Sequence, residues 1–249
     1  MTNGADRLTP TDYVVAEGVE EIRPGQFENS RALTRVVIPA SVRKIGANAF
    51  KGCSELKIVE ISEGVEEIGD AAFSDCESLT TVVIPKSVKH IGSGAFSYCV
   101  ELTSVVIPEG VEAIGAGQFK YCKSLTSVVI PKSVKRIGND AFDCCKSLKS
   151  VVIPDGVKFI GESAFGHCKS LASVVIPESV IIIGDGAFGY CKSLASVVIP
   201  GKVKIIGEIA FSGCKSLTSV VIPASVKTIG EEVFEGRLLF ALADSFFDD

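Results

Sequence analysis

The 249-residue sequence predicts a parallel β-solenoid of about nine to ten coils, with 23 residues in each coil. Two observations support this fold class. The chain nearly coincides with itself when it is shifted by 23 residues, and within each 23-residue unit the apolar residues, prolines and glycines return to the same positions. A period between about 20 and 50 residues is typical of stacked repeats rather than of a globule with one central site.

Eight clear units open with a leucine, and a ninth, opening at Leu217, loses the pattern near its end. Positions below are counted from 1 at that leucine to 23, and the consensus is L-T-S-V-V-I-P-x-S-V-K-x-I-G-x-x-A-F-x-x-C-K-S. The eight opening residues are Leu33, Leu56, Leu79, Leu102, Leu125, Leu148, Leu171 and Leu194.

The unit that opens at Leu125 shows what each position is expected to do. Val128 and Ile130 share one face of a short strand, which Pro131 ends because proline lacks an amide donor. Val134 lies in a second short strand or extended arm, which runs over residues 133–137. The strand pattern therefore predicts two short β-elements per coil.

The rest of that unit is expected to turn the chain back toward the next coil. Gly138 stands where a side chain would crowd the bend. Ala141 and Phe142 point inward from a single helical or 3₁₀ turn, and Cys145 closes the coil. Together with Leu125 and Ile137, these residues give each coil eight inward side chains.

A single coil is not expected to fold alone. Burying eight side chains contributes about 1.5 to 3 kcal/mol each, whereas ordering each of its residues costs about 1 to 2 kcal/mol. Neighbouring coils must therefore share backbone hydrogen bonds and cover each other's apolar ends, which makes the two ends of the stack special.

The ends of the chain are interpreted as caps. Residues 10–32 form a divergent copy in which Val19, Ile22 and Phe27 keep the register and Ser30 replaces cysteine. Residues 237–247 have helical spacing and predict a helical C-terminal cap, with a partner-docking helix as the alternative. The predicted organisation is an N-terminal segment and capping repeat (1–32), a solenoid (33–239) and a C-terminal cap or tail (240–249).

The repeat resembles the BspA-like family of leucine-rich repeats, which shares the L-x-x-[LV]-x-[IL]-P, V-x-x-I-G and A-F-x-x-C segments over residues 10–236. The departures are Ser62 for proline, Gln118 and Val233 for alanine, and Arg237 for cysteine. The resemblance implies a right-handed leucine-rich-repeat solenoid used for recognition and cell adhesion, commonly on microbial cell surfaces. It implies no catalytic residues.

Eight of the nine cysteines recur every 23 residues and are expected to form one buried column of reduced thiols. Side chains on parallel coils point the same way, about 4.7 to 4.9 Å apart, which is too far for a relaxed disulfide. A metal site is the alternative, but no histidine lies in register with the column. Cys144, one position earlier than Cys145, is expected to face outward and to react readily.

Composition and spacing argue against several functions. A net charge of -5 and a pI near 5.3 offer no overall electrostatic attraction for nucleic acid, and no apolar run reaches the roughly 18 residues of a membrane span. His90 and His167 lie three unit boundaries apart, so they cannot share a proton. The sequence predicts no enzyme, cofactor or metal.

The compartment stays open. Residues 1–10 lack the basic start and apolar stretch of a secretory signal, which favours the cytoplasm, whereas the family resemblance implies the cell surface.

The first candidate site is an outward row of serine and valine at positions 3 and 5. Alternation along the strand places both positions on the solvent side, which leaves branched apolar groups exposed. The alternative is that valine is present for its β-propensity alone. The residues assigned to partner binding are Val106, Ser127, Val129, Ser150, Val152, Ser173, Val175, Ser196 and Val198.

A second row of lysines at position 22, with aromatic residues at position 20, predicts a secondary basic edge. Its members are Tyr121, Lys123, Lys146, His167, Lys169, Tyr190, Lys192 and Lys215. Repulsion within the row implies an anionic partner, or compensation by the acidic column of Glu162, Asp185, Glu208 and Glu231, or plain solubility. At position 8, the alternation of Lys86, Glu109, Lys132 and Asp155 predicts ion pairs between coils.

These patterns predict a non-catalytic recognition scaffold that binds a protein ligand through the Ser/Val row. The alternative is a structural solenoid that associates with itself, through the same row or end to end. A flat repetitive face could also match an ordered surface such as ice or a crystalline polysaccharide, but paired threonines are missing.

Overall fold

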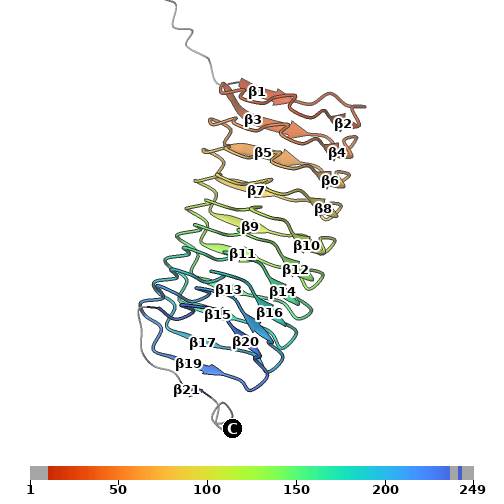
Figure 1. Ribbon diagram of the computed structural model, residues 1–249. Helices are drawn as coiled ribbons and strands as arrows, with labels where there is room; N and C mark the ends of the chain where they lie inside the picture. Colours follow the sequence, from red (N-terminus) through yellow and green to blue (C-terminus); the bar gives the residue numbers. More distant parts are fainter. Residues whose placement is uncertain (1–10, 236–240, 243–249) are drawn as a thin grey trace, which may run out of the picture.

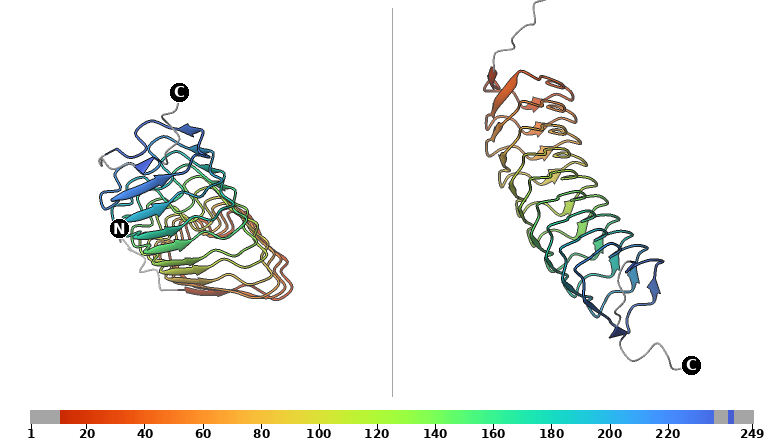
Figure 2. Two further views of the ribbon diagram at one scale, coloured as in Figure 1. Left: turned by 90° about the horizontal axis from the view of Figure 1, so that it is seen from below. Right: turned by 90° about the vertical axis from the view of Figure 1, so that its left-hand side faces the viewer.

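The computed structural model describes residues 11–235 together with residues 241–242, and it shows one curved, twisted stack of similar coils (Figure 1, Figure 2). Each coil contributes a longer strand on one side of the stack and a two-residue strand on another. All strand pairs are parallel and join neighbouring coils, 23 residues apart through most of the stack. The predicted parallel β-solenoid is therefore confirmed.

The longer strands form a first ladder, which carries positions 3 to 5 of each repeat. It is divided into groups of six, two and three hydrogen-bonded strands. These strands are β1 (Thr11–Val14), β3 (Leu33–Ile38), β5 (Ile58–Ile61), β7 (Thr81–Val83), β9 (Ser104–Val106), β11 (Ser127–Val129), β13 (Ser150–Val152), β15 (Ser173–Val175), β17 (Ser196–Val198), β19 (Ser219–Ile222) and β21 (Ala241–Leu242).

The second ladder shows that the second short β-element expected over residues 133–137 is a strand only at positions 12 and 13. Its strands are β2 (Glu21–Ile22), β4 (Lys44–Ile45), β6 (Glu67–Ile68), β8 (His90–Ile91), β10 (Ala113–Ile114), β12 (Arg136–Ile137), β14 (Phe159–Ile160), β16 (Ile182–Ile183), β18 (Ile205–Ile206) and β20 (Thr228–Ile229).

The helical or 3₁₀ turn predicted around Ala141 and Phe142 is wrong. The segment is a series of tight turns in which Asp140 and Cys144 have φ angles of 57° and 61°, outside the helical region. Between them, the Phe142 amide donates to the Ala164 carbonyl of the next coil at 2.8 Å. The left-handed residues aim alternate amides along the stack, and this third set of coil-to-coil hydrogen bonds takes the place of a helix.

The same two positions, 16 and 20, have positive φ in every described coil, although most of the residues there are not glycine. Ile209 is the most unfavourable case, with a φ of 48° on a β-branched residue. Tyrosine, serine and isoleucine do not favour this conformation, so the sequence analysis did not predict it.

Gly138 has the role expected from the sequence. A Cβ atom there would lie 2.8 Å from the Ala116 nitrogen and 2.9 Å from the Gly115 carbonyl carbon of the preceding coil. Position 14 is therefore glycine because neighbouring backbones approach closely at this bend.

The core consists of columns formed by the eight inward positions, which are buried or nearly buried in coil after coil. The phenylalanine column is the most regular, with neighbouring rings stacked 5.1 to 5.7 Å apart from Phe27 to Phe234. At the N-terminal end, the Tyr13 ring lies 4.8 Å from Phe27 at a tilt of 58°, so it covers the last ring of the column.

All nine cysteines are free and buried, as expected for the eight of the column. Each column thiol donates to the carbonyl of the phenylalanine 26 residues earlier; for Cys122 and Phe96 the distance is 3.2 Å. Burial raises the pKa of Cys53 and of Cys214 to about 11, and it raises the pKa of the more deeply buried thiols further. The column therefore stays protonated at neutral pH.

The predicted helical C-terminal cap is wrong where the structure describes it. Ala241–Leu242 form strand β21, which pairs in parallel with Val221 and Ile222 of β19. The remainder of residues 237–247 lies outside the described residues. The open edge of β19 offers backbone donors and acceptors, and a strand satisfies these groups where a helix cannot.

Gln118 interrupts the second ladder. In the other coils the glycine amide at position 14 donates to the isoleucine carbonyl of the preceding coil at 2.8 to 2.9 Å. The Gly115 amide donates instead to Oε1 of Gln118 at 2.6 Å, and β8 and β10 belong to different sheets. Gln118 is fully buried, and its Nε2 has no hydrogen-bond partner. The junction between these two coils is therefore a weak point of the stack.

Replacing Gln118 with the repeat's usual alanine is expected to stabilise the protein. The substitution frees the Gly115 amide for the preceding coil and removes a buried unpaired donor, a group that costs about 1 to 3 kcal/mol. Urea unfolding followed by circular dichroism measures the gain. The control is Ala141→Gln at the same position of the next coil, which should destabilise; an equal or lower stability of Gln118→Ala would contradict the interpretation.

The thiol column predicts a steep loss of stability in alkali. The folded-state pKa values are raised above the unfolded value of about 8.5, so the unfolded chain releases protons first. The stabilisation that the protonated thiols give to the folded state is complete below about pH 8.5 and falls as pH rises toward about 11. Each fully buried thiol should contribute about 1.4 kcal/mol per pH unit to the slope.

Urea titrations between pH 8 and 10.5 under reducing conditions measure this slope. Cys122→Ala with Cys145→Ala should be less stable at pH 7 because of the lost volume, but should lose stability more slowly as pH rises. Identical slopes for the two proteins would show that the column does not control the alkaline transition.

Candidate recognition surface

The first ladder presents a regular outer face made of the Ser/Val strip, defined as positions 3 and 5 from β7 to β19. Its valines are between 56% and 75% exposed, while the intervening position 4 is buried or partly buried. The serines of the strip are also exposed. Every residue assigned to partner binding is exposed, and these residues lie in β9, β11, β13, β15 and β17, which are stacked along one side of the solenoid (Figure 1).

Backbone pairing fixes the spacing of this strip. Ser127 and Val129 pair with Ser104 and Val106 of the preceding coil, and the same register holds between β13 and β15 and between β17 and β19. Because the side chains rise from a hydrogen-bonded scaffold, a partner meets rows of hydroxyl and branched apolar groups at preset positions.

Charged residues end the strip at its N-terminal side, a feature that the sequence analysis did not identify. Arg35 Nη2 lies 2.7 Å from Glu60 Oε1, and Arg35 Nη1 lies 3.7 Å from Asp12 Oδ2. The hydrogen bond to Glu60 raises the pKa of Arg35. The signal was present at positions 3 and 5, where Arg35 and Glu60 replace serine and valine.

The secondary edge is brought together in part. The lysines at position 22 and His167 are exposed, as are Tyr98 and Tyr190. Tyr98 stacks on Tyr121 at 4.7 Å, and His167 stacks on Tyr190 at 4.9 Å. Lys123 Nζ lies 6.0 Å from the centroid of the Tyr121 ring. The edge therefore consists of two aromatic pairs beside a row of ammonium groups.

Cys144 separates these two pairs, and the expectation that it faces outward and reacts readily is wrong. Cys144 is only 8% exposed. Burial, followed by the neighbouring Asp143 carboxylate, raises the pKa of its thiol, and the Tyr121 side chain hydrogen-bonds to it. The left-handed backbone at position 20 places the Cys144 thiol in the row of position-20 side chains, between Tyr121 and His167. The thiol therefore packs against its neighbours instead of projecting into solvent.

The acidic column does not compensate the lysine row through direct contact. Within residues 11–235, no ion pair of 4.0 Å or less joins Lys146, Lys169, Lys192 or Lys215 to Glu162, Asp185, Glu208 or Glu231. Along the chain, the buried turn with alanine and phenylalanine at positions 17 and 18 separates the acidic residues at position 15 from the lysines at position 22. The nearby pairs involve Lys120, whose Nζ lies 3.2 Å from Asp140 Oδ1 and 3.5 Å from Asp143 Oδ2.

The predicted ion pairs at position 8 are also wrong. Among the described residues, the ion pairs do not include Lys86, Glu109, Lys132 or Asp155. Instead, the carboxylate of Glu63 accepts hydrogen bonds from the amides of Lys86 and Ser87 at 3.2 and 3.0 Å. These bonds lower the pKa of Glu63. At this turn a carboxylate caps the next coil's backbone.

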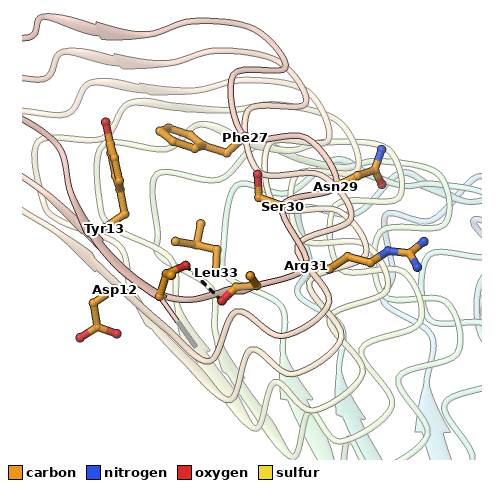
Figure 3. A pocket seen from close by; sticks show the side chains of 9 residues that line it. Asp12, Tyr13, Phe27, Asn29, Ser30, Arg31 and Leu33 are labelled. Carbon is orange, nitrogen blue, oxygen red and sulfur yellow. Dashed lines mark hydrogen bonds between the residues drawn. The ribbon is translucent and has the colours of Figure 1, made fainter. Parts of the chain in front are cut away.

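Among the described residues, hollows also occur away from these rows. One, of about 500 Å³, opens at the N-terminal end of the stack, where Tyr13, Phe27 and Leu33 line it and a Thr11 hydroxyl donates to the Ala32 carbonyl at 3.2 Å (Figure 3). Another, of about 490 Å³, lies at the Gln118 interruption and includes His90 and Glu112. Neither contains a nucleophile and base joined by a hydrogen bond.

The described residues offer neither a metal site nor a membrane helix. Over the described part of the chain, no three His, Cys, Asp or Glu residues are grouped so that they could hold a metal ion. The described residues also include no helix with the length and apolar character needed to cross a bilayer.

The coil geometry and the repeat define a leucine-rich-repeat solenoid. Its sequence matches the family described as "BspA type Leucine rich repeat region (6 copies)" over residues 20–148 and 112–239, which together span most of the chain. The chain therefore belongs to the BspA-type leucine-rich-repeat family. A comparison with curated proteins found no match.

Solved structures of similar fold include bacterial repeat proteins. A leucine rich cell surface protein from Faecalibacterium prausnitzii is 31% identical with a TM-score of 0.67, and the match covers 92% of this chain and 79% of that one. A leucine rich repeat protein from T. pallidum is 36% identical with a TM-score of 0.61, and the match covers 66% and 78% of the two chains. The pneumococcal vaccine antigen PcpA shares the fold at 19% identity, with a TM-score of 0.52 and coverage of 94% and 78%.

The burial of the thiols predicts slow alkylation of the native protein. At pH 7.5 iodoacetamide should modify the folded chain at least about 10-fold more slowly than glutathione, and Cys144 should be modified first because it lies nearest the surface. Peptide mass spectrometry over time identifies the site. Tyr121→Ala should expose Cys144 and accelerate its labelling, with Tyr98→Ala as the control. Labelling of wild-type Cys144 at the rate of glutathione would contradict the assigned packing.

Proposed function

We propose that this protein is a non-catalytic recognition scaffold that binds a partner protein through the Ser/Val strip. The observation that carries the proposal is the row of valines more than half exposed on a rigid, hydrogen-bonded sheet face. Contiguous apolar groups exposed to water are a feature of interaction surfaces, and membership of a leucine-rich-repeat family supports this use of the fold.

The chemistry of the strip selects the kind of partner. Its serines offer both donors and acceptors, and its valines offer apolar contact without charge. A protein surface that combines apolar side chains with polar groups fits this pattern. The lysine and aromatic edge, including Lys146, Lys169 and Tyr190, supplies a secondary contact for acidic groups at the rim of such a partner.

A similar structure supports a proposal about where the protein acts. The F. prausnitzii structure is described as a leucine rich cell surface protein. Together with the exposed strip, this likeness supports recognition of a host or cell-surface ligand. An interface at this strip would have polar serines distributed among its apolar contacts, as non-obligate protein interfaces do.

The strip is tested by replacing Val152, Val175 and Val198 together with lysine. Extracts of the native source are passed over the immobilised wild type and the variant, and bound proteins are quantified by mass spectrometry. A protein captured by the wild type should bind the variant at least about 10-fold more weakly, because three charges must be desolvated at the contact. The circular-dichroism spectrum should stay unchanged, since all three side chains point into solvent.

A matched control is available on another side of the coils. Phe159, Ile182 and Ile205 lie in β14, β16 and β18, and replacing all three with lysine adds the same charge to the second ladder. This control should retain the captured partner. Equal capture by the strip variant and the wild type would overturn the assignment of the strip.

A further inference from the structure

The outward side of the second ladder changes character along the stack. Position 12 points away from the core in successive strands, and its residue in β4, β6, β8, β10 and β12 is Lys44, Glu67, His90, Ala113 and Arg136. In β14, β16 and β18 it is Phe159, Ile182 and Ile205. These three residues form an apolar stripe, in which Phe159 and Ile205 are 42% and 38% exposed and Ile182 is partly exposed.

The members of the apolar stripe are direct neighbours. Phe159 pairs with Ile182, and Ile182 pairs with Ile205, in one parallel sheet. Neighbouring strands lie about 4.8 Å apart, so the three side chains form a continuous surface. Nothing in the core requires large apolar residues here, because Lys44, Glu67 and Arg136 occupy the same position in earlier coils.

Opposite charges flank the apolar stripe on its two sides. Lys158 and Lys204 stand immediately before the stripe residues in the chain, and both are exposed. Glu162 and Glu208 follow the same strands at position 15 and are also exposed. Because the strands are parallel, every lysine lies on one side and every carboxylate on the other. Among the described residues these four groups form no ion pair within 4.0 Å.

This charge pattern distinguishes between occupants. An acidic peptide or an anionic membrane would be attracted by the lysines but repelled by the carboxylates, and a basic partner would meet the opposite conflict. A surface with an apolar centre, one basic side and one acidic side is satisfied by a partner with the same arrangement. A second copy of this chain provides that arrangement.

We infer that two copies associate through the apolar stripe, with a two-fold axis parallel to the direction in which the coils stack. Rotation about such an axis places the lysine side of one protomer against the carboxylate side of its partner, while the stripes meet at the centre. Rotation about an axis perpendicular to the stack and lying in the contact would bring lysines against lysines. The charges therefore fix the relative direction of the two stacks.

The inferred dimer is weak and leaves the Ser/Val strip free. The apolar stripe extends over only three coils. We therefore expect it to bury far less area than the roughly 800 Å² per partner of a standard interface. A dissociation constant on the order of 100 μM is expected for such a small contact. Since the stripe lies on the second ladder, dimerisation leaves both Ser/Val strips free. The two-fold rotation turns the outward faces of the two strips in opposite directions, so a dimer could hold two partner molecules at once.

The test uses two variants with complementary charges. Lys158→Glu with Lys204→Glu makes both sides acidic, and Glu162→Lys with Glu208→Lys makes both sides basic. Sedimentation equilibrium of the wild type from 10 to 500 μM should show a monomer–dimer equilibrium. Each variant alone should dimerise at least about 10-fold more weakly, and an equimolar mixture should recover a dimer.

Controls separate this inference from the proposed function and from misfolding. The strip variant with lysine at positions 152, 175 and 198 should dimerise like the wild type, whereas the variant with lysine at positions 159, 182 and 205 should be monomeric but still capture the partner. Circular dichroism and thermal melting show whether each variant folds. The variants Lys158→Gln with Lys204→Gln carry no repulsive charge and provide a second measure of the lost attraction.

Four results would overturn the inference. The first three are a wild-type protein that stays monomeric at 500 μM, charge variants that each dimerise as strongly as the wild type, and a mixture of the two variants that stays monomeric. A dimer abolished by the strip variant would place the contact on the Ser/Val strip instead, and so would also overturn it.

Discussion

Hydrogen bonds between the backbones of successive coils are the constraint on which the rest of this structure depends. Three sets of these bonds run along the stack: the first ladder, the second ladder and the amides of the turn at positions 16, 18 and 20. A coil of this length cannot satisfy its own backbone or bury its own core, so each coil is stable only between two neighbours. The bonds also set the register, and the register places equivalent residues in columns.

The columns explain both the uniform core and the distribution of surface chemistry. Stacked phenylalanine rings and a row of protonated thiols fill the interior because identical side chains recur at one spacing. On the outside the same repetition produces rows, such as the Ser/Val strip, rather than the convergent unlike groups of a catalytic site.

The features that are particular to this protein come from residues that depart from the repeat. Gln118 diverts the Gly115 amide and opens one coil junction. Cys144 separates two aromatic pairs, and Arg35 with Glu60 ends the strip with charge. Phe159, Ile182 and Ile205 turn a polar row into an apolar stripe. Each departure can be recognised in the sequence as a residue that differs from the repeat consensus. Its effect, however, depends on the residues that adjacent coils place beside it.

The sequence was enough to predict the coil length, the inward residues, two short β-elements per coil and the close approach at position 14, because these follow from a strict period and from the absence of a side chain in glycine. It did not predict the turn, because left-handed backbone at Asp140 and Cys144 is imposed by hydrogen bonds to the next coil rather than by local preference. For the same reason it misplaced the thiol of Cys144, the ion pairs at position 8 and the strand at Ala241–Leu242. The local sequence pattern predicts the features that every coil shares. Contacts between coils decide whether each non-repeating residue is buried, paired or exposed.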